Sequence, residues 1–239
     1  MTTTIFHKIY NVIKRITPSI LHKFLRSFFT AVFTPIRFSI KKGHFKSSIQ
    51  VKAVDRFGEP IPWYTYPCVD FLKFRMLKNV NILEFGAGQS TLWWGKNAST
   101  VISFEGNKEW YNYLKNRMPA NVSLFLPNDN NPESCISDIN AILSEKRGIK
   151  FDIVIIDGLW RAELIDIAKK FLTPNGAIIC DNSEGYGFYD GFKDDNQFQK
   201  VDFYGYAAGC ILQSCTTIYF RADCILFKSD VPTLNIEEY

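Results

Sequence analysis

The spacing of apolar residues divides the chain into regions with different predicted structure. From Asn81 to Asp181, short apolar runs alternate with segments whose apolar residues recur every three or four positions. Runs of the first kind predict buried strands, and segments of the second kind predict amphipathic helices. This alternation is typical of βαβ units, in which helices cover both faces of a parallel sheet. The predicted strands are NILEF (81–85), VISFE (101–105), VSLFL (122–126), FDIVIID (151–157) and GAIICD (176–181), and the predicted helices span 90–97, 108–118, 134–146 and 163–171.

The pattern changes after Asp181. A loop rich in Gly, Tyr and Asp (183–197) precedes two apolar segments, KVDFYGY (200–206) and CTTIYFR (215–221), with no helical pattern between them. Since a parallel connection needs a longer crossover, these two segments are expected to pair antiparallel. We therefore predict an α/β, Rossmann-like fold with a mostly parallel seven-stranded sheet, helices on both faces and an antiparallel C-terminal strand pair.

The N-terminal residues 1–45 predict a separate helical arm. Apolar residues at helical spacing indicate two amphipathic helices, at 4–16 and 20–33, with Ser19 as the N-cap of the second helix and Pro35 as its end. Residues 46–80 are expected to form a linker, with a short strand at 48–54, and a lead-in helix at 67–77. The main domain is then predicted over 81–239.

Charge separates the arm from the rest of the chain. The first 54 residues contain ten Lys or Arg and no Asp or Glu, whereas the remainder contains 18 basic and 24 acidic residues. A basic amphipathic arm favours an anionic membrane surface as the partner of residues 1–45. Its apolar faces fit equally well against the main domain or against a second subunit in a homodimer. The acidic remainder argues against nucleic acid.

The sequence also indicates a cellular location. The longest charge-free stretch of the arm, 27–36, is much shorter than the roughly 20 apolar residues that span a bilayer. The arm lacks the layout of a secretory signal. Six cysteines without a CxxC pair are read as reduced thiols rather than zinc ligands. We expect a cytoplasmic protein, peripheral at the inner membrane surface.

The turn at the end of the first predicted strand carries the clearest chemistry. Gly86 and Gly88 allow a tight turn and close approach of a ligand to the backbone. The third glycine of a dinucleotide-binding fingerprint is missing, and Glu84 beside the turn would repel a phosphate. An acidic neighbour instead favours the ammonium and sulfonium of S-adenosylmethionine. Glu105, at the end of the second strand, is placed to accept both hydroxyls of a ribose.

Together, ILEFGAGQS (82–90) and VISFEGNKEW (101–110) resemble the first two motifs of class I S-adenosylmethionine-dependent methyltransferases. The resemblance runs from about Trp63 to Arg221 and includes the predicted strand count. It implies that the turn after the first strand holds the methionine half of the cofactor and that Glu105 holds the ribose. The cofactor-binding residues expected on this basis are Glu84, Gly86, Ala87, Gly88, Ser90, Thr91, Glu105, Gly106, Asn107, Asp157 and Gly158.

Polar residues also follow the fourth and fifth predicted strands. Asp157 closes the fourth strand, and Asp181 with Asn182 closes the fifth. Ligands bind at the carboxyl ends of parallel strands, so these side chains are expected to converge. Their oxygens suit Mg²⁺, and their arrangement resembles the metal ligands of the catechol-type O-methyltransferases. In that family a lysine base lies three positions after the first Asp, where this chain has Trp160.

Without a metal, Asp157 or Asp181 is the predicted general base, since a buried carboxylate beside another acid has a raised pKa. The alternative is that Asp157 holds the cofactor or a water molecule, while Asp181 and Asn182 only cap a turn. The acceptor site is predicted from aromatic residues near the strand ends and from the arginine after Trp160. Its expected residues are Trp63, Tyr64, Tyr66, Trp160, Arg161 and Tyr186.

These patterns predict a methyltransferase that uses S-adenosylmethionine and methylates an oxygen of a small molecule or a sugar or glycan. Two alternatives remain. One is a catalytically silent, membrane-associated module that binds the cofactor. The other is an aminopropyltransferase-like enzyme on the same fold, for which the acidic residues Asp190, Asp194 and Asp195 would serve a polyamine.

Overall fold

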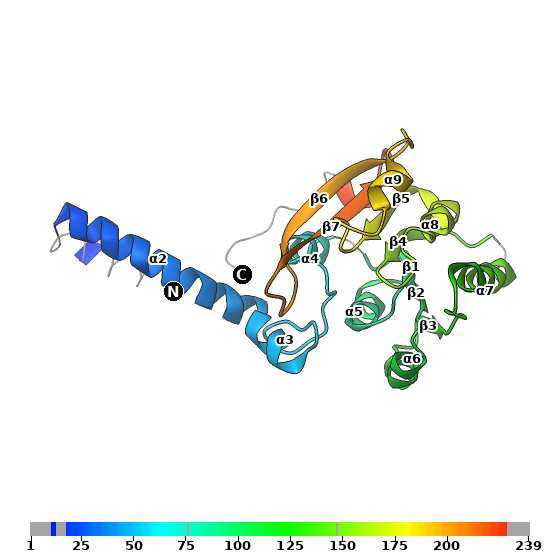
Figure 1. The fold of residues 1–239 in the computed structure, drawn as a ribbon, viewed down its shortest axis with the longest axis horizontal. Helices are drawn as coiled ribbons and strands as arrows, with labels where there is room; N and C mark the ends of the chain where they lie inside the picture. Colours follow the sequence, from blue (N-terminus) through cyan, green and yellow to red (C-terminus); the bar gives the residue numbers. More distant parts are fainter. Residues whose placement is uncertain (1–10, 13–17, 76, 147, 229–239) are drawn as a thin grey trace.

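The structure, a computed structural model, describes residues 11–12, 18–75, 77–146 and 148–228. Its centre is a seven-stranded sheet in the order β3-β2-β1-β4-β5-β7-β6 (Figure 1). Strands β1 to β5 run parallel, whereas β7 is antiparallel to both β5 and β6. The predicted sheet and its antiparallel end are therefore confirmed. The strands are β1 (Asn81–Phe85), β2 (Thr100–Phe104), β3 (Val122–Phe125), β4 (Phe151–Ile156), β5 (Leu172–Cys180), β6 (Gln199–Tyr206) and β7 (Gln213–Phe220).

Helices cover both faces of this sheet, and each face has its own hydrophobic core. The central strand β4 sends Ile153 and Ile155 to one face and Val154 and Ile156 to the other, all fully buried. Helices α4 (Tyr66–Lys73) and α5 (Gln89–Asn97) pack on the first face. Helices α7 (Pro132–Glu145), α8 (Ile165–Phe171) and the short α9 (Phe188–Phe192) pack on the second. Helix α6 (Lys108–Leu114) continues into the 3-10 turn Lys115–Arg117.

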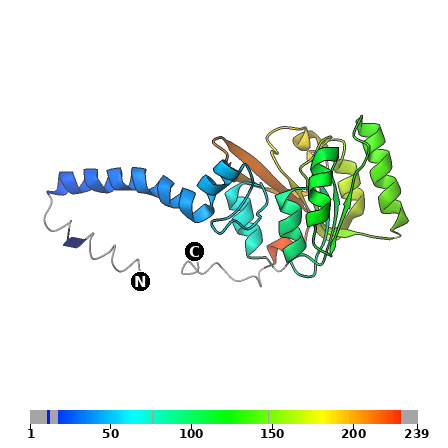
Figure 2. The same cartoon turned by 90° about the horizontal axis from the view of Figure 1, so that it is seen from below.

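The arm differs from its prediction. Helix α2 (Ser19–Lys42) continues through Pro35 instead of ending there, and Ser19 is its first residue rather than a capping one. The helix extends because its last turn is held by the domain: Phe38 packs against Tyr66, and Lys42 forms an ion pair with Asp70. Both views show α2 projecting away from the sheet (Figures 1 and 2). The helix predicted at 4–16 lies outside the described residues, except for 11–12, which are helical.

The predicted linker is also partly wrong. Residues His44–Gln50 form helix α3 where a strand was expected at 48–54, and Val54 makes only an isolated bridge to Pro60. Gly43 separates α2 from α3 with a φ of +72°, and a side chain there would overlap the carbonyl group of Asp55. The turn at Gly43 therefore packs closely against the loop at Asp55, and this contact fixes the direction of α3 relative to α2. Across the described ranges, none of the helices combines the length and hydropathy needed to span a bilayer.

Candidate active site

The turn after β1 lies between the ends of β2 and β4. The amide of Gly86 donates to the carbonyl of Phe104 at 2.8 Å, and the amide of Asp157 donates to the carbonyl of Phe85 at 2.8 Å. Gly86 has a φ of +100°, and a Cβ there would lie 2.6 Å from backbone atoms of Asp157 and Gly158. A Cβ on Gly88 would meet no atom within 4 Å. The turn is therefore packed tightly at Gly86 and open at Gly88, where a ligand can approach the backbone.

Glu84 lies behind this turn rather than facing a ligand. Its side chain has no exposed surface, and its carboxylate accepts hydrogen bonds from the hydroxyls of Ser90 (2.6 Å), Thr91 (2.5 Å) and Ser103 (2.7 Å). Burial raises the pKa of Glu84 to about 7, although the three hydroxyls oppose that rise. The Thr91 hydroxyl also accepts from the amide of Gly88 at 2.9 Å. Of the predicted cofactor contacts, Glu84, Ser90 and Thr91 therefore use their side chains to hold the turn.

Glu105 occupies the predicted position at the end of β2. Its Oε2 accepts from the amide of Ala87 at 3.1 Å, and its Oε1 accepts from the amide of Asn107 at 2.7 Å. Burial raises the pKa of this carboxyl group, and the nearby charge of Asp129 adds to that effect. The Asn107 side chain caps α6 by accepting from the amide of Trp110 at 2.8 Å. Each Glu105 oxygen thus keeps acceptor capacity for a ligand hydroxyl while the backbone fixes its position.

A small cavity of about 40 Å³ adjoins Glu105. Gly106, Asp129, Gly158 and Trp160 contribute to its walls. The sequence analysis did not select Asp129, although the polar loop after the third strand reaches the same edge of the sheet. Trp160, predicted to contact the acceptor, lies on the Glu105 side instead. Its backbone has a φ of +55°, and among the described residues its buried Nε1 has no hydrogen-bond partner.

Arg161 joins the ends of β4 and β5. One guanidinium nitrogen lies 3.0 Å from Asp157 Oδ1, and another donates to the carbonyl of Asp181 at 2.6 Å and to Asn182 Oδ1 at 3.1 Å. The Nε donates to the carbonyl of Gly158 at 3.0 Å. The three residues predicted to converge therefore do so around a guanidinium. The ring of Tyr186 covers the outer side of that guanidinium, with its centroid 4.4 Å away.

This arrangement does not fit a metal ion. The positive charge among Asp157, Asp181 and Asn182 comes from Arg161, and Asp181 Oδ1 is already bonded to the hydroxyl of Thr216 at 2.6 Å. Within the described part of the chain, there is no cluster of three or more His, Cys, Asp or Glu able to hold a metal. The predicted Mg²⁺ site therefore gains no support, because its donors are used by the protein itself.

The carboxyl groups of Asp157 and Asp181 differ in their surroundings. Burial, with a contribution from Asp181, raises the pKa of Asp157 despite the opposing charge of Arg161. Burial also raises the pKa of Asp181 to about 6, opposed by the Thr216 hydroxyl. The Asp157 side chain is 19% exposed, whereas Asp181 as a residue is 4% exposed. Asp157 is thus the carboxyl group of the pair that a ligand can reach.

The aromatic residues predicted for the acceptor site take different positions. Trp63 is 39% exposed, and Tyr186 is largely exposed above Arg161. Tyr64 is fully buried, and its hydroxyl accepts from Trp94 Nε1 at 3.3 Å. Tyr66 packs against Phe38 and His44 at the base of the arm, apart from the other predicted acceptor contacts. Neighbouring side chains in the segment 63–66 face different directions, so Tyr64 contacts Trp94 whereas Tyr66 contacts Phe38 of the arm.

The fold has counterparts among solved structures. The O-methyltransferase from Bacillus cereus in complex with SAH is 15% identical in sequence, covers 82% of this chain and 96% of its own, and gives a TM-score of 0.53. The O-methyltransferase TomG from Streptomyces achromogenes in complex with SAM is 14% identical, covers 63% of this chain and 77% of its own, and gives a TM-score of 0.49. The N-methyltransferase NodS from Bradyrhizobium japonicum WM9 is 14% identical, covers 64% of this chain and 92% of its own, and gives a TM-score of 0.44.

Sequence comparisons add nothing to this likeness: no protein-family model matches the chain, and no curated protein matches it either. The structural likeness to the Bacillus cereus protein, together with the strand order, shows that this chain has the class I methyltransferase fold. The fold predicted from the apolar pattern is thereby confirmed.

Proposed function

We propose that this protein transfers a methyl group from S-adenosylmethionine to an oxygen atom of its acceptor. The observation that carries the proposal is the placement of Glu105. Its two oxygens are bonded to the amides of Ala87 and Asn107, which puts a carboxylate between the turn after β1 and the start of α6. A carboxylate held there suits a ribose, and the open backbone at Gly88 suits the methionine half of the cofactor.

The remaining predicted contacts fit the same ligand. Gly106 and Asn107 follow Glu105 directly, and Gly158 closes the turn on the β4 side. Asp129 and the Nε1 of Trp160, which has no hydrogen-bond partner in the described part of the chain, add polar atoms beside Glu105, where the adenine would lie. Asp157 directly precedes Gly158, and we place its side chain between the cofactor and the acceptor. The cofactor supplies the methyl group, and the side chains described here bind it and orient it.

Asp157 is the proposed general base. In the transfer, the acceptor oxygen forms a bond to the methyl carbon, the carbon–sulfur bond breaks, and its electron pair neutralises the sulfonium. The acceptor hydroxyl loses its proton to the Asp157 carboxylate. A raised pKa makes this carboxylate a stronger base, and its side chain remains accessible. Asp181 acts as a positioning residue, since it is bonded to Thr216 and to Arg161.

The acceptor is proposed to be a small molecule or a sugar or glycan that stacks on Tyr186 and Trp63. The aminopropyltransferase alternative loses its main feature, because Asp190 pairs with Lys193 at 2.9 Å and Asp195 pairs with Lys169 at 2.9 Å. These acidic groups are already neutralised on the surface. A silent cofactor-binding module differs from the proposed enzyme only in turnover, which an assay resolves.

The arm is proposed to attach the enzyme to an anionic membrane. None of the 24 residues of α2, all of which the structure describes, is buried. One stripe of the helix is polar throughout and contains Lys23, Arg26, Arg37 and Lys41 at helical spacing. The rest of its surface is mostly apolar, including exposed Phe24, Phe28 and Phe33.

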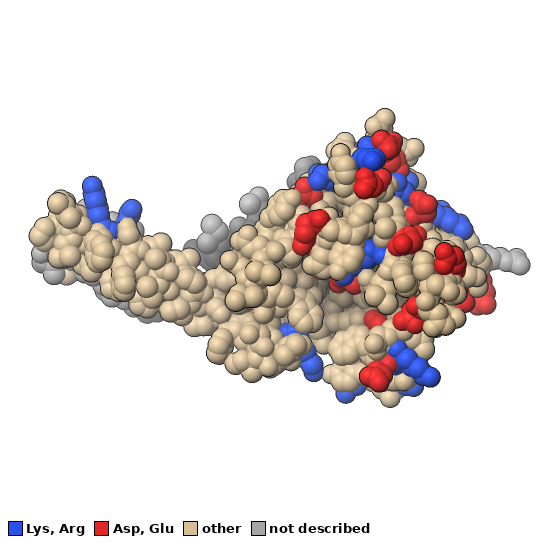
Figure 3. Space-filling model, viewed as in Figure 1, with Lys and Arg blue, Asp and Glu red and all other residues tan. Residues whose placement is uncertain are grey.

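This division is typical of a helix that lies in the plane of a membrane surface. Figure 3 shows the described part of the arm as largely uncharged, with basic and no acidic side chains on the visible side. A second copy of the same basic arm would be repelled, so we favour lipid over a homodimer. All six cysteines are free thiols, which fits the cytoplasmic face of the membrane.

A turnover assay tests the proposed activity. The full-length protein is incubated with S-adenosylmethionine labelled in the methyl group and with bacterial extracts fractionated by size and charge. Label is expected in a small-molecule or glycan fraction, and mild alkali and acid treatments separate ester from ether products. Formation of S-adenosylhomocysteine with the label on nitrogen or carbon would contradict oxygen methylation. Absence of transfer in every fraction, with cofactor still bound, would favour the silent module.

A further inference from the structure

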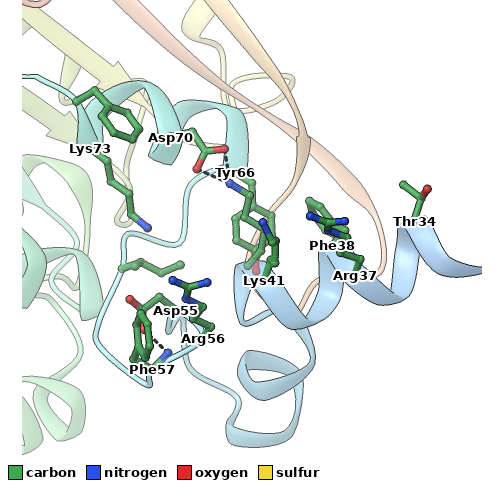
Figure 4. Close-up of a pocket in the computed structure, with 13 residues that line it drawn as sticks. Thr34, Arg37, Phe38, Lys41, Asp55, Arg56, Phe57, Tyr66, Asp70 and Lys73 are labelled. Atoms are coloured by element: carbon green, nitrogen blue, oxygen red, sulfur yellow. Dashed lines mark hydrogen bonds and ion pairs between the residues drawn. The ribbon is translucent and has the colours of Figure 1, made fainter. Parts of the chain in front are cut away.

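A second, larger cavity lies where the arm joins the domain (Figure 4). Its volume is about 470 Å³, compared with about 40 Å³ for the cavity beside Glu105. The walls come from the last turns of α2, the loop around 55–57 and helix α4. This is the size range in which proteins bind small molecules, and none of its residues belongs to the proposed active site.

Basic residues predominate on these walls. Arg37, Lys41 and Lys42 come from α2, Arg56 from the loop and Lys73 from α4, whereas the acidic residues that line it within the described part of the chain are Asp55 and Asp70. Both acids are engaged by the protein. Lys42 Nζ donates to both carboxylate oxygens of Asp70, at 2.6 and 2.7 Å. Asp55 Oδ1 accepts from the backbone amides of 57, 58 and 59 at 2.9 to 3.0 Å. The cavity therefore keeps a positive excess.

Two of the basic groups, Lys73 and Arg56, face each other across the cavity. Figure 4 shows Lys73 pointing down from α4 towards Arg56 on the loop. Burial lowers the pKa of Lys73. The carboxylates of Asp70 and Asp55 oppose that lowering, and the smaller effects of Lys42 and Arg56 add to it. The charges of Arg56 and Lys73 repel each other, and an anion bound between them would offset that repulsion.

The other side of the cavity is apolar. Phe38, Phe57, Ile61, Tyr66 and Phe74 contribute to it. Arg56 also stacks on the ring of Phe57, with the guanidinium carbon 4.6 Å from the ring centroid, which directs the guanidinium. A ligand that fills both sides combines a multiply charged anion with a bulkier, less polar group. Guanidinium groups bind phosphate oxygens in pairs, which makes phosphate the anion that fits best.

We propose that this cavity binds a phosphorylated ligand, with the phosphate held between Arg56 and Lys73 and the attached group against the aromatic wall. The ligand is either a soluble phosphate ester or the headgroup of a lipid in the membrane on which the arm lies. In the second case, the cavity selects one lipid while α2 supplies general attachment. The proposal does not depend on methyl transfer.

Calorimetry with the full-length protein separates the sources. The soluble probes are inorganic pyrophosphate and glycerol 3-phosphate, and the lipid probe is phosphatidic acid in phosphatidylcholine vesicles. Vesicles with phosphatidylglycerol at the same surface charge correct for general attraction. Binding of a soluble probe assigns a free phosphate ester, and preference for phosphatidic acid over phosphatidylglycerol assigns a lipid headgroup. Either result supports the site.

The double variant Arg56→Gln, Lys73→Gln tests the assignment to this cavity. Arg56 and Lys73 are exposed residues, although the cavity partly desolvates the ammonium group of Lys73. The fold is therefore expected to survive, and unchanged binding of S-adenosylhomocysteine would demonstrate it. Loss of two charge-assisted contacts is expected to weaken phosphate binding by more than roughly tenfold. Lys78→Gln, an exposed lysine outside the cavity, serves as the matched control. Equal binding by the double variant and the control, or no binding of any probe by the wild type, would overturn the proposal.

Discussion

The guanidinium of Arg161 lies 3.0 Å from the carboxylate of Asp157, at the place where the catechol-type pattern would put a metal ion. The same side chain reaches the backbone carbonyl of Asp181 at the end of the next strand. A fixed organic cation thus holds two strand ends together and balances the Asp157 carboxylate. Arg161 therefore supplies the positive charge at the position where the sequence pattern predicted Mg²⁺.

Methyl transfer is therefore expected to be insensitive to chelation. Incubation with EDTA, followed by gel filtration and assay in metal-free buffer, should leave the rate unchanged, and added Mg²⁺ should not increase it. The physical reason is that the donors of the predicted site are already bonded to Arg161 and Thr216. A rate lost on chelation and restored by Mg²⁺ would show that this interpretation of the site is wrong.

Replacing Arg161 should be costly even without a metal. Arg161→Met leaves Asp157 without its ion-pair partner and removes the bonds to 158, 181 and 182. Breaking a largely buried pair from one side destabilises a protein by about 3–5 kcal/mol. Urea denaturation should show a loss of that order. Arg221→Met is the control, because Arg221 is a partly buried arginine with a buried Nε that forms no ion pair with Asp157 among the described residues. An equal loss of stability in both variants would show that Arg161 has no special role.

Asp157→Asn should abolish most turnover while the cofactor still binds. Removing a general base lowers kcat by about 10²–10⁴-fold. Asp166→Asn, on the exposed surface of α8, is the matched control and should behave as wild type. The variant's pH profile is informative: wild-type kcat should rise with pH as Asp157 loses its proton, and this limb should vanish in Asp157→Asn. A retained limb would assign the base elsewhere.

The raised pKa of Asp181 gives a stability prediction. Its pKa is about 6 in the folded protein against an ordinary value of 3.8, so folding favours the protonated form. The resulting contribution to stability is fully present below pH 3.8 and is lost as the pH rises through about 6. Asp181→Asn keeps an acceptor for Thr216 and removes the charge. At pH 7.5 the variant should unfold at a higher urea concentration than wild type, and its free energy of unfolding should be larger by up to about 3 kcal/mol. This difference in stability should vanish near pH 4. The opposite pH trend would contradict the assignment.

Gly86→Ala should damage the site more than its backbone conformation alone explains. A positive φ costs a non-glycine residue about 1–3 kcal/mol. Gly148 also has a positive φ, +73°, but a Cβ there meets no atom within 4 Å, whereas a Cβ on Gly86 would lie 2.6 Å from the backbone of Asp157. Thermal unfolding and calorimetry of both variants separate strain from collision. Gly148→Ala should keep cofactor binding, and Gly86→Ala should lose it.

Attachment through the arm is tested on its apolar face. Phe24→Ser with Phe28→Ser removes two exposed aromatic rings without changing charge, and Thr30→Ser on the polar stripe is the control. Each buried Phe contributes about 1.5–3 kcal/mol, so the double variant should bind vesicles with anionic lipid over 100-fold more weakly. Equal sedimentation of both, or a dimer that dissociates only in the double variant, would favour protein packing over lipid.

The sheet was predictable because a buried strand between two helical layers leaves an unmistakable apolar run, as in residues 151–156. The arm was predicted less well, since Pro35 is a local signal for a helix end while the contacts that extend α2, from Phe38 and Lys42, come from distant residues. Local propensity cannot register such contacts. The same reason explains why residues 48–50, which belong to helix α3, were expected to lie in a strand.

For the candidate active site, the positions of residues along the strands were predictable, whereas the directions of their side chains were not. Sequence position alone placed Glu105, Asp157 and Asp181 at one edge, because strand ends in a parallel sheet share that edge. Side-chain direction was beyond that argument: Glu84 points into the core, Tyr66 faces the arm, and Trp160 turns towards Glu105 through a positive φ. The sequence did not indicate Asp129, because residues in the loop after β3 have no regular spacing that shows which of them lies near the strand ends.

Cofactor binding is the central claim, and calorimetry with S-adenosylhomocysteine tests it most directly. The wild type should bind one equivalent, and Glu105→Ala should weaken binding by roughly tenfold or more through loss of charge-assisted bonds to the ribose. Glu109→Ala, an exposed acid in the first turn of α6, should bind as wild type. Absence of binding to the wild type, or equal affinity in Glu105→Ala, would contradict the assignment of this edge of the sheet as a cofactor site.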